Sequence, residues 1–193
     1  MNKLALIGIS ISSFLFGVEK LDSKYWIQYG PAHAKFHAIE YFSFSCPKCL
    51  EFFVKEFPSI KNRHIDSGDL SWAFHPDPAD LLTLQAMVCL DRLSPTQKML
   101  FFEAIMNNLT ACKEKGQECA LIQAAMEAFK DPQPDLEDLD FLKTTQAFQD
   151  AFAFVSQKDA IQVIPSVEID GRLYEQIPNL TLVDAHIRRV SVK

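Results

Sequence analysis

The order of the predicted secondary-structure elements is the feature that most restricts the fold of this chain. Strands and a helix alternate near the N-terminus, and a long helical block follows. A hairpin with its turn at Asp170-Gly171 and a helix close the sequence. A βαβ unit separated in this way from a β-hairpin and a helix predicts an α/β sheet with an inserted helical domain. The predicted strands are 25–33 (an edge strand or irregular lead-in), 36–44, 70–74, 164–169 and 173–174, and the predicted helices are 47–57, 81–93, 96–109, 120–129, 140–162 and 180–190.

The length of the chain fits this division. Its 193 residues can hold an α/β domain of about 100 residues, a common domain size, together with an insertion. We expect the α/β domain to consist of residues 19–76 and 158–193, and the helical domain to occupy residues 77–157. Pro58 should end or kink the first helix.

The first 18 residues are predicted not to belong to the fold. Lys3 precedes 15 uncharged residues that end at Val18, and this pattern is typical of a secretory signal peptide. The stretch is shorter than the ~20 residues of a membrane-spanning helix. Because Leu15 is a poor residue for a cleavage site, an uncleaved signal anchor stays open, as does a buried N-terminal helix or strand. Export would place the cysteines in an oxidising compartment.

The chemistry of the chain is expected at Cys46-Pro47-Lys48-Cys49, where a strand runs into a helix. A cysteine at a helix N-terminus faces unpaired N–H groups and the positive end of the helix dipole, so its thiolate is stabilised. Lys48 would add a positive charge, and Pro47 suits the first helical turn. We expect Cys46 to exchange with substrate thiols and Cys49, one turn further on, to resolve the mixed disulfide.

Two other interpretations of this motif stay open. It would form half of a zinc site if a second C-x-x-C or a pair of histidines were present, but the sequence has neither, and no metal is expected. It would also serve as a purely structural bridge, although C-x-x-C pairs are usually redox-active.

The segment from Glu40 to Cys49 resembles the active-site segment of the DsbA family of thiol:disulfide oxidoreductases, and residues 163–172 match the position of that family's cis-proline loop. The resemblance implies a thioredoxin fold with an inserted helical domain. It also implies that Pro165 is cis and faces Cys46, and that backbone groups of Ile164 pair with a substrate chain in a strand-like manner.

Glu40 lies in the middle of an apolar strand, six residues before Cys46. A buried carboxylate without a partner is costly, so it tends to stay protonated or to find one. The resemblance implies that Glu40 assists proton transfer with the buried Cys49. The alternative is an edge strand on which Glu40 faces water.

The five cysteines of the chain are an odd number, so at least one has no intrachain partner. Cys112 and Cys119 flank a polar loop between two predicted helices, and we expect them to form a structural disulfide in an exported protein. Cys89 lies on an apolar helix, where it is either a buried thiol or the partner of Cys112 or Cys119. The 16 phenylalanines should fill the core, although Phe42 or Phe44, if exposed, would help bind unfolded chains.

These patterns together predict an exported, periplasmic thiol:disulfide oxidoreductase. Its substrates would be folding secreted proteins, and we expect a monomer without a bound cofactor. A net charge of −6 and the lack of a basic run argue against a nucleic-acid partner.

The sequence indicates a thiol:disulfide oxidoreductase more firmly than it indicates whether the enzyme oxidises or reduces its substrates. An oxidase, our first expectation, would be reoxidised by a quinone-linked membrane partner, whereas a reductase would receive electrons from a membrane donor. The resemblance leaves this choice open, because Lys48 and Ile164 stand where strongly oxidising members usually have His and Val. A non-catalytic binding module of the same fold is the remaining alternative.

Overall fold

The computed structural model describes residues 24–77, 80–116, 122, 125, 138–156 and 163–191. The predicted signal peptide, Met1–Val18, and nearly all of the predicted helix 120–129 lie outside these ranges. Among the helices that the structure describes, none is both long and apolar enough to cross a membrane.

A five-stranded mixed sheet forms the centre of the molecule, with the strand order β1-β3-β2-β4-β5. The central strand β2 is parallel to β3 and antiparallel to β4, while β1 pairs antiparallel with the outer side of β3. The predicted lead-in is therefore a true edge strand, and the hairpin predicted at Asp170-Gly171 joins β4 to β5. The strands are β1 (Ile27–Tyr29), β2 (Phe36–Phe42), β3 (Leu70–Pro76), β4 (Ser166–Ile169) and β5 (Arg172–Tyr174).

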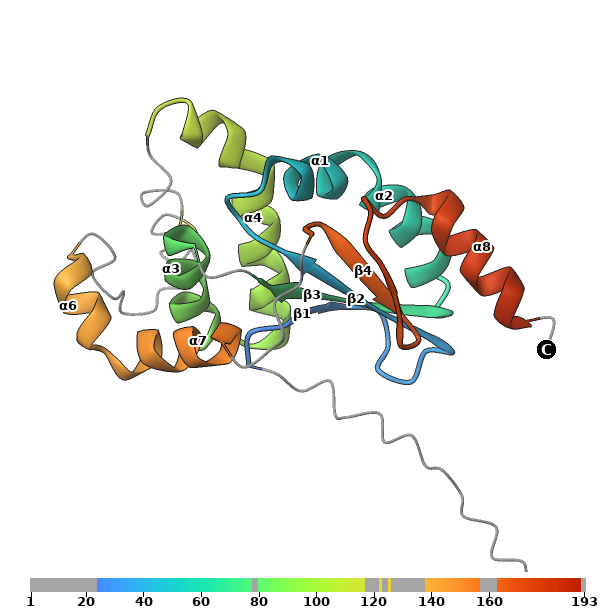
Figure 1. The fold of residues 1–193 in the computed structure, drawn as a ribbon, viewed down its shortest axis with the longest axis horizontal. Helices are drawn as coiled ribbons and strands as arrows, with labels where there is room; N and C mark the ends of the chain where they lie inside the picture. Colours follow the sequence, from blue (N-terminus) through green and yellow to red (C-terminus); the bar gives the residue numbers. More distant parts are fainter. Residues whose placement is uncertain are drawn as a thin grey trace, which may run out of the picture.

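The first helical segment covers one side of the sheet together with the C-terminal helix (Figure 1). It is kinked at Glu56, just before Pro58, and then continues beyond the predicted end, through one wide π-helical turn. Cys49, Phe52 and Phe53 face the core at helical spacing, whereas Val54 is exposed. The elements on this side are α1 (Pro47–Lys55), α2 (Phe57–Ile60), the π-helical turn (Lys61–Ile65) and α8 (Leu180–Ser191).

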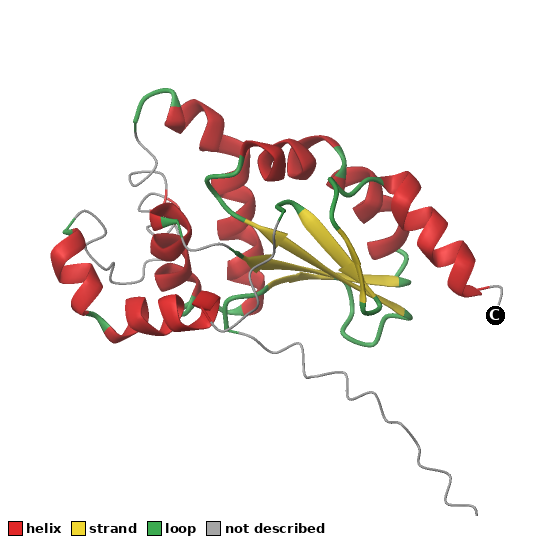
Figure 2. Cartoon of the chain, viewed as in Figure 1, coloured by secondary structure: helices red, strands yellow, loops and turns green. Residues whose placement is uncertain are grey.

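The remaining helices gather at one end of the sheet, and α4 is the one that packs along it (Figures 1 and 2). The prediction of a single helix over 140–162 is wrong. Thr145 has an extended backbone (φ −76°, ψ 143°), and its Oγ1 accepts the N–H of Phe148, so one helix ends there and another begins. The helices are α3 (Leu81–Leu90), α4 (Pro95–Lys113), α6 (Leu139–Thr144) and α7 (Gln146–Ser156).

Aromatic rings make up a large part of the core. Phe102 of α4 is fully buried, and its ring centroid lies 4.7 Å from that of Phe74 in β3 and 5.0 Å from that of Phe53 in α1. Phe42 and Phe44 are also buried, at 0% and 1% exposure. The alternative that these two phenylalanines bind unfolded chains at the surface is therefore wrong, and the expectation that phenylalanine fills the core is confirmed for them.

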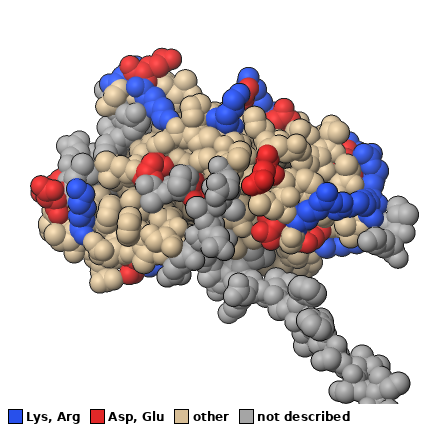
Figure 3. All heavy atoms as spheres, viewed as in Figure 1, with Lys and Arg blue, Asp and Glu red and all other residues tan. Residues whose placement is uncertain are grey.

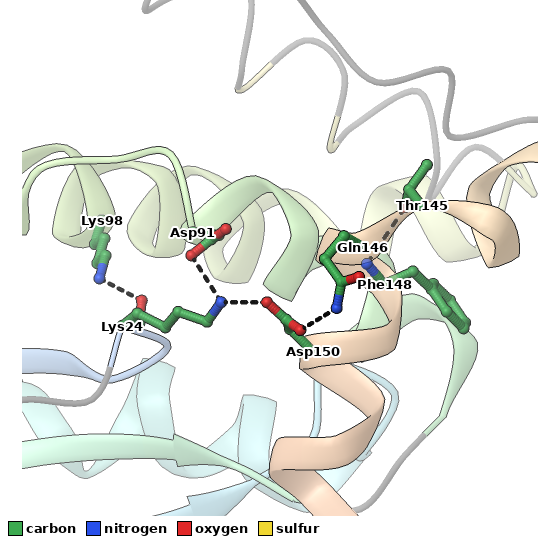
Figure 4. A network of polar contacts seen from close by, with 7 residues as sticks. All are labelled: Lys24, Asp91, Lys98, Thr145, Gln146, Phe148 and Asp150. Atoms are coloured by element: carbon green, nitrogen blue, oxygen red, sulfur yellow. Dashed lines mark hydrogen bonds and ion pairs between the residues drawn. The ribbon is translucent and has the colours of Figure 1, made fainter.

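A polar junction attaches α7 to the start of the described chain (Figure 4). The Lys24 ammonium pairs with Asp91, just after α3, at 3.3 Å and with Asp150 of α7 at 3.1 Å. Lys98 of α4 donates to the backbone carbonyl of Lys24. The division into domains at residues 77 and 157 stays a prediction, but within the described residues α4 shares one core with the sheet.

Charged side chains of both signs are scattered over the face shown in Figure 3, and basic ones gather toward its right-hand end. Helix α8 lies at that end and carries Arg188 and Arg189 in its last turn (Figure 1). Positive charge at a helix C-terminus interacts favourably with the helix dipole.

Candidate active site

Cys46 caps the N-terminus of α1. Its backbone is extended (φ −82°, ψ 113°), and its Sγ accepts the N–H of Cys49 at 3.2 Å, while Pro47 occupies the first turn. Cys46 is half-buried, Cys49 is 1% exposed, and both are thiols in the structure. The sequence motif thus places one accessible sulfur at the helix end and one enclosed sulfur a turn deeper.

The pKa values of the two thiols are shifted in opposite directions. A hydrogen bond from the Cys49 thiol is the largest factor that lowers the pKa of Cys46, to about 6, and the N–H groups of Cys49 and Lys48 and the charge of Lys113 act in the same direction. The same sulfur–sulfur contact and burial raise the pKa of Cys49 well above its usual value. Near neutral pH the pair therefore holds its negative charge on Cys46.

The lysine that lowers the pKa of Cys46 through its charge is Lys113, not the expected Lys48. The Lys48 ammonium is exposed and pairs with Glu51 at 3.0 Å. Lys113, in the last turn of α4, donates instead to the backbone carbonyl of Ser45 at 3.0 Å, directly before Cys46. Lys48 contributes its backbone N–H.

The Ile164–Pro165 loop lies opposite Cys46. Its peptide bond is cis, and the Sγ of Cys46 is 3.9 Å from the carbonyl oxygen of Ile164. Pro165 is buried, Ile164 is half-buried and Val163 is 45% exposed. The strand predicted from residue 164 begins at Ser166, so Ile164 and Pro165 precede the β4 ladder and leave the Ile164 backbone beside the reactive sulfur.

Glu40 lies beneath the cysteine pair, in the central strand β2. Its side chain is 0% exposed, so the alternative that it faces water on an edge strand is wrong. Oε2 accepts a hydrogen bond from Trp72 Nε1 at 3.2 Å, whereas Oε1 has no hydrogen-bond partner among the described residues. Burial is the main cause that raises the pKa of Glu40 well above its usual value, and the nearby charge of Cys46 adds to it.

A second carboxylate at the site, Asp80, was not predicted from the sequence. It is the N-cap of α3 and accepts the hydroxyls of Ser43, Ser45 and Thr83, the last two at 2.7 Å and 2.6 Å. Burial alone would raise the pKa of Asp80, but these hydrogen bonds outweigh it and lower the pKa. The N-terminal end of α3 is thereby tied to the loop that carries Cys46. The only sequence signal was an Asp before an apolar helix, which is typical of an ordinary cap.

Two further cysteines, Cys89 and Cys112, are described outside the Cys46–Cys49 pair. Cys89 is fully buried in α3, and Cys112 is half-buried at the end of α4. Cys119 lies outside the described residues, so the Cys112–Cys119 disulfide stays a prediction. In the part of the chain that the structure describes, no three His, Cys, Asp or Glu side chains come together as a metal site.

Comparison with solved structures identifies the architecture. The α-DsbA1 protein of Wolbachia pipientis superimposes with a TM-score of 0.67 at 19% identity, covering 88% of this chain and 92% of that one. A protein-disulfide isomerase from Novosphingobium aromaticivorans gives 0.60 at 14% identity, with 86% and 96% covered. BdbD from Bacillus subtilis gives 0.55 at 16% identity, with 86% and 92% covered. At these identities the likeness establishes the fold.

The sequence comparisons agree with this fold. No curated protein matches the chain in sequence. A family model described as thioredoxin, however, matches residues 22–188, which include both the C-x-x-C helix and the Ile164–Pro165 loop. The predicted thioredoxin fold with inserted helices is confirmed: the chain belongs to the thioredoxin family and has the architecture of the DsbA proteins.

Proposed function

We propose that the protein is an exported thiol:disulfide oxidoreductase that oxidises cysteines of folding secreted proteins. The observation that carries the proposal is the asymmetric pair at the N-terminus of α1, an accessible Cys46 with a pKa of about 6 above a buried Cys49 with a raised pKa. The solved structures of the same fold are named as DsbA proteins and as a protein-disulfide isomerase, which supports this class of reaction.

The exchange would proceed in two balanced steps. A substrate thiolate attacks Cys46 Sγ of the oxidised pair, so a mixed disulfide forms and the sulfur of Cys49 leaves with the electron pair and takes up a proton. A second substrate thiolate then attacks the substrate sulfur of the mixed disulfide and releases Cys46 as a thiolate. The substrate loses two electrons to the cysteine pair, and no other cofactor takes part.

The acidity of Cys46 favours the oxidising direction. A pKa near 6 leaves its sulfur mostly ionised at neutral pH, and this stabilises the reduced pair relative to the disulfide. A disulfide whose reduced form is stabilised is a stronger oxidant.

Two neighbouring groups would assist the exchange. Glu40, a buried carboxyl with a raised pKa and an uncommitted Oε1, is suited to exchange a proton with Cys49 as its sulfur leaves or attacks. The Ile164 backbone, 3.9 Å from Cys46 Sγ at its carbonyl, would pair with an extended substrate chain without selecting a sequence.

The cellular setting follows from the same proposal. The uncharged stretch after Lys3 would direct the chain to the periplasm, either cleaved or as an anchor. An oxidase of this kind needs a membrane partner that accepts its electrons and passes them to quinone. Lys48 and Ile164, which differ from the residues of strongly oxidising relatives, keep a reductase charged by a membrane electron donor as the second candidate.

A thiolate titration combined with a redox equilibrium tests the proposal. We expect the reduced protein to show a rise in absorbance at 240 nm with a midpoint near pH 6, and Cys46→Ser to abolish it. Equilibration with reduced and oxidised glutathione should show an oxidising pair, and the oxidised protein should form disulfides in a reduced, unfolded protein. Glu40→Gln should keep the attack on Cys46 but slow the release or return of Cys49 about tenfold or more.

The outcomes separate the candidates. A strongly reducing equilibrium together with an ordinary thiol titration would favour the reductase over the oxidase. The absence of any exchange with glutathione would contradict both enzymes and leave a binding module.

A further inference from the structure

Ser45, the residue directly before Cys46, is held from both sides by charged residues of the helical insertion. Its hydroxyl donates to Asp80 Oδ1 at 2.7 Å, and its carbonyl oxygen accepts from Lys113 Nζ at 3.0 Å. Asp80 begins α3 and Lys113 ends α4, so the two contacts come from different helices. In Figure 1 the loop between β2 and α1 passes beside α4, as these contacts require. We call this arrangement the Ser45 clamp.

We propose that the Ser45 clamp makes the helical insertion part of redox control, with Lys113 as a residue that adds to the stability of the Cys46 thiolate and Asp80 as the residue that holds the loop in reach. The inference rests on the proposed function, because it concerns the same cysteine pair. It extends that function by assigning part of the strength of the oxidant to two residues outside the C-x-x-C motif and the Ile164–Pro165 loop.

Asp80 fixes the position of the loop through several hydrogen bonds. Besides Ser45, it accepts the hydroxyl of Ser43, which in turn accepts the N–H of Ser45 at 3.0 Å. Thr83 completes the arrangement, since its Oγ1 accepts the N–H of Phe44 at 3.2 Å. The hydrogen bonds of Ser43, Phe44 and Ser45 to Asp80 and Thr83 hold the loop so that it presents the Ser45 carbonyl to Lys113 in one position.

The charged and titratable groups that face Cys46 come from several elements. Cys49 lies one turn below in α1, and Glu40 lies beneath the pair in β2. Lys113 approaches from α4, and its charge lowers the pKa of Cys46. Lys48 is paired with Glu51, whereas the charge of Lys113 acts on the Cys46 sulfur.

Substitution of Lys113 tests the proposal through the titration of Cys46. In Lys113→Met we expect the thiolate midpoint to rise by roughly half to one pH unit. At pH 7 the equilibrium constant for oxidation of glutathione should then fall roughly three- to fivefold. Lys113→Gln, which keeps a donor for the Ser45 carbonyl but no charge, should behave like Lys113→Met, and Lys113→Arg should stay near the wild type.

Lys115→Met is the matched control, because Lys115 is exposed in the turn just after α4. It should leave the midpoint unchanged. If Lys113→Gln and Lys113→Met titrate like Lys115→Met, the proposal is overturned. The titration is independent of catalysis. If the wild type fails to exchange disulfides but the Lys113 variants still shift the thiolate midpoint, the proposed function is contradicted and the role of the clamp is retained.

Discussion

Helices α4 and α7 both come from the stretch that the sequence predicts as an insertion, yet they are attached to the molecule in different ways. Phe102 of α4 is buried among rings from β3 and α1, and Lys113 at its end reaches the loop before Cys46. Helix α7 packs on α3 and adds Phe148 and Ala151 to the core, but it leaves Phe152 49% exposed and is also held by the Lys24 junction. Position within an insertion therefore does not tell whether a helix reaches the site.

The same substitution in the two helices should give the largest contrast. Phe102→Ala removes a ring that is 0% exposed and should lower the free energy of unfolding by about 3–5 kcal/mol. Phe152→Ala removes a half-exposed ring and should change it by about 0.5 kcal/mol or less. Urea denaturation of both variants measures the difference, and equal losses would show that α4 and α7 belong to one equally packed unit.

The two aspartate caps provide a second, smaller contrast. Asp80 caps α3 and also holds Ser43 and Ser45, whereas Asp138 caps α6 through the N–H of Phe141 at 2.9 Å. Asp80→Ala should cost about 2–3 kcal/mol, and Asp138→Ala about 0.5–1 kcal/mol.

The Asp80 contribution should also depend on pH. Because the folded protein lowers the pKa of Asp80 below 3.8, the contribution is fully present above that pH and is lost as the pH falls through the folded value. Unfolding curves of the wild type and Asp80→Ala should therefore converge as the pH drops below about 4. A difference that stays constant down to pH 2 would contradict the assignment.

The Lys24 junction should give the smallest effect and a local one. Lys24→Met removes two exposed ion pairs, so the global stability should fall by less than about 1 kcal/mol. Amide hydrogen exchange should speed up in α7 and stay unchanged in α4. Lys143→Met is the control, because the Lys143 ammonium lies 4.0 Å from an exposed Asp140 in α6. Equal acceleration in α4 and α7 would remove the distinction between the two helices.

The sequence allowed prediction of the parts of the molecule that depend on local pattern. The C-x-x-C helix start, the buried position of Glu40 and the hairpin at Asp170-Gly171 follow from short segments, each with its own periodicity or turn chemistry. The break at Thr145 was missed because two threonines, Thr144 and Thr145, in an apolar helical pattern give no strong stop signal.

The contacts of Asp80 and Lys113 were missed for another reason. They join polar residues 35 and 68 positions apart in the chain, and a long-range hydrogen bond leaves no periodic pattern in a sequence. Local spacing also misleads at Val54, which has the helical spacing of a core residue but is exposed.

The pairing of β2 with β4 has a consequence for how such a site tolerates change. The ladder runs from Ala38 opposite Ile169 to Tyr41 opposite Ser166, and the Ile164–Pro165 loop follows at its end. Two sequence segments 118 residues apart are thus brought to one sulfur by strand register, whatever the length of chain between them. Parts of the insertion away from Asp80 and Lys113 can therefore lengthen or shorten while β2 and β4 keep the distance between Cys46 and the Ile164–Pro165 loop.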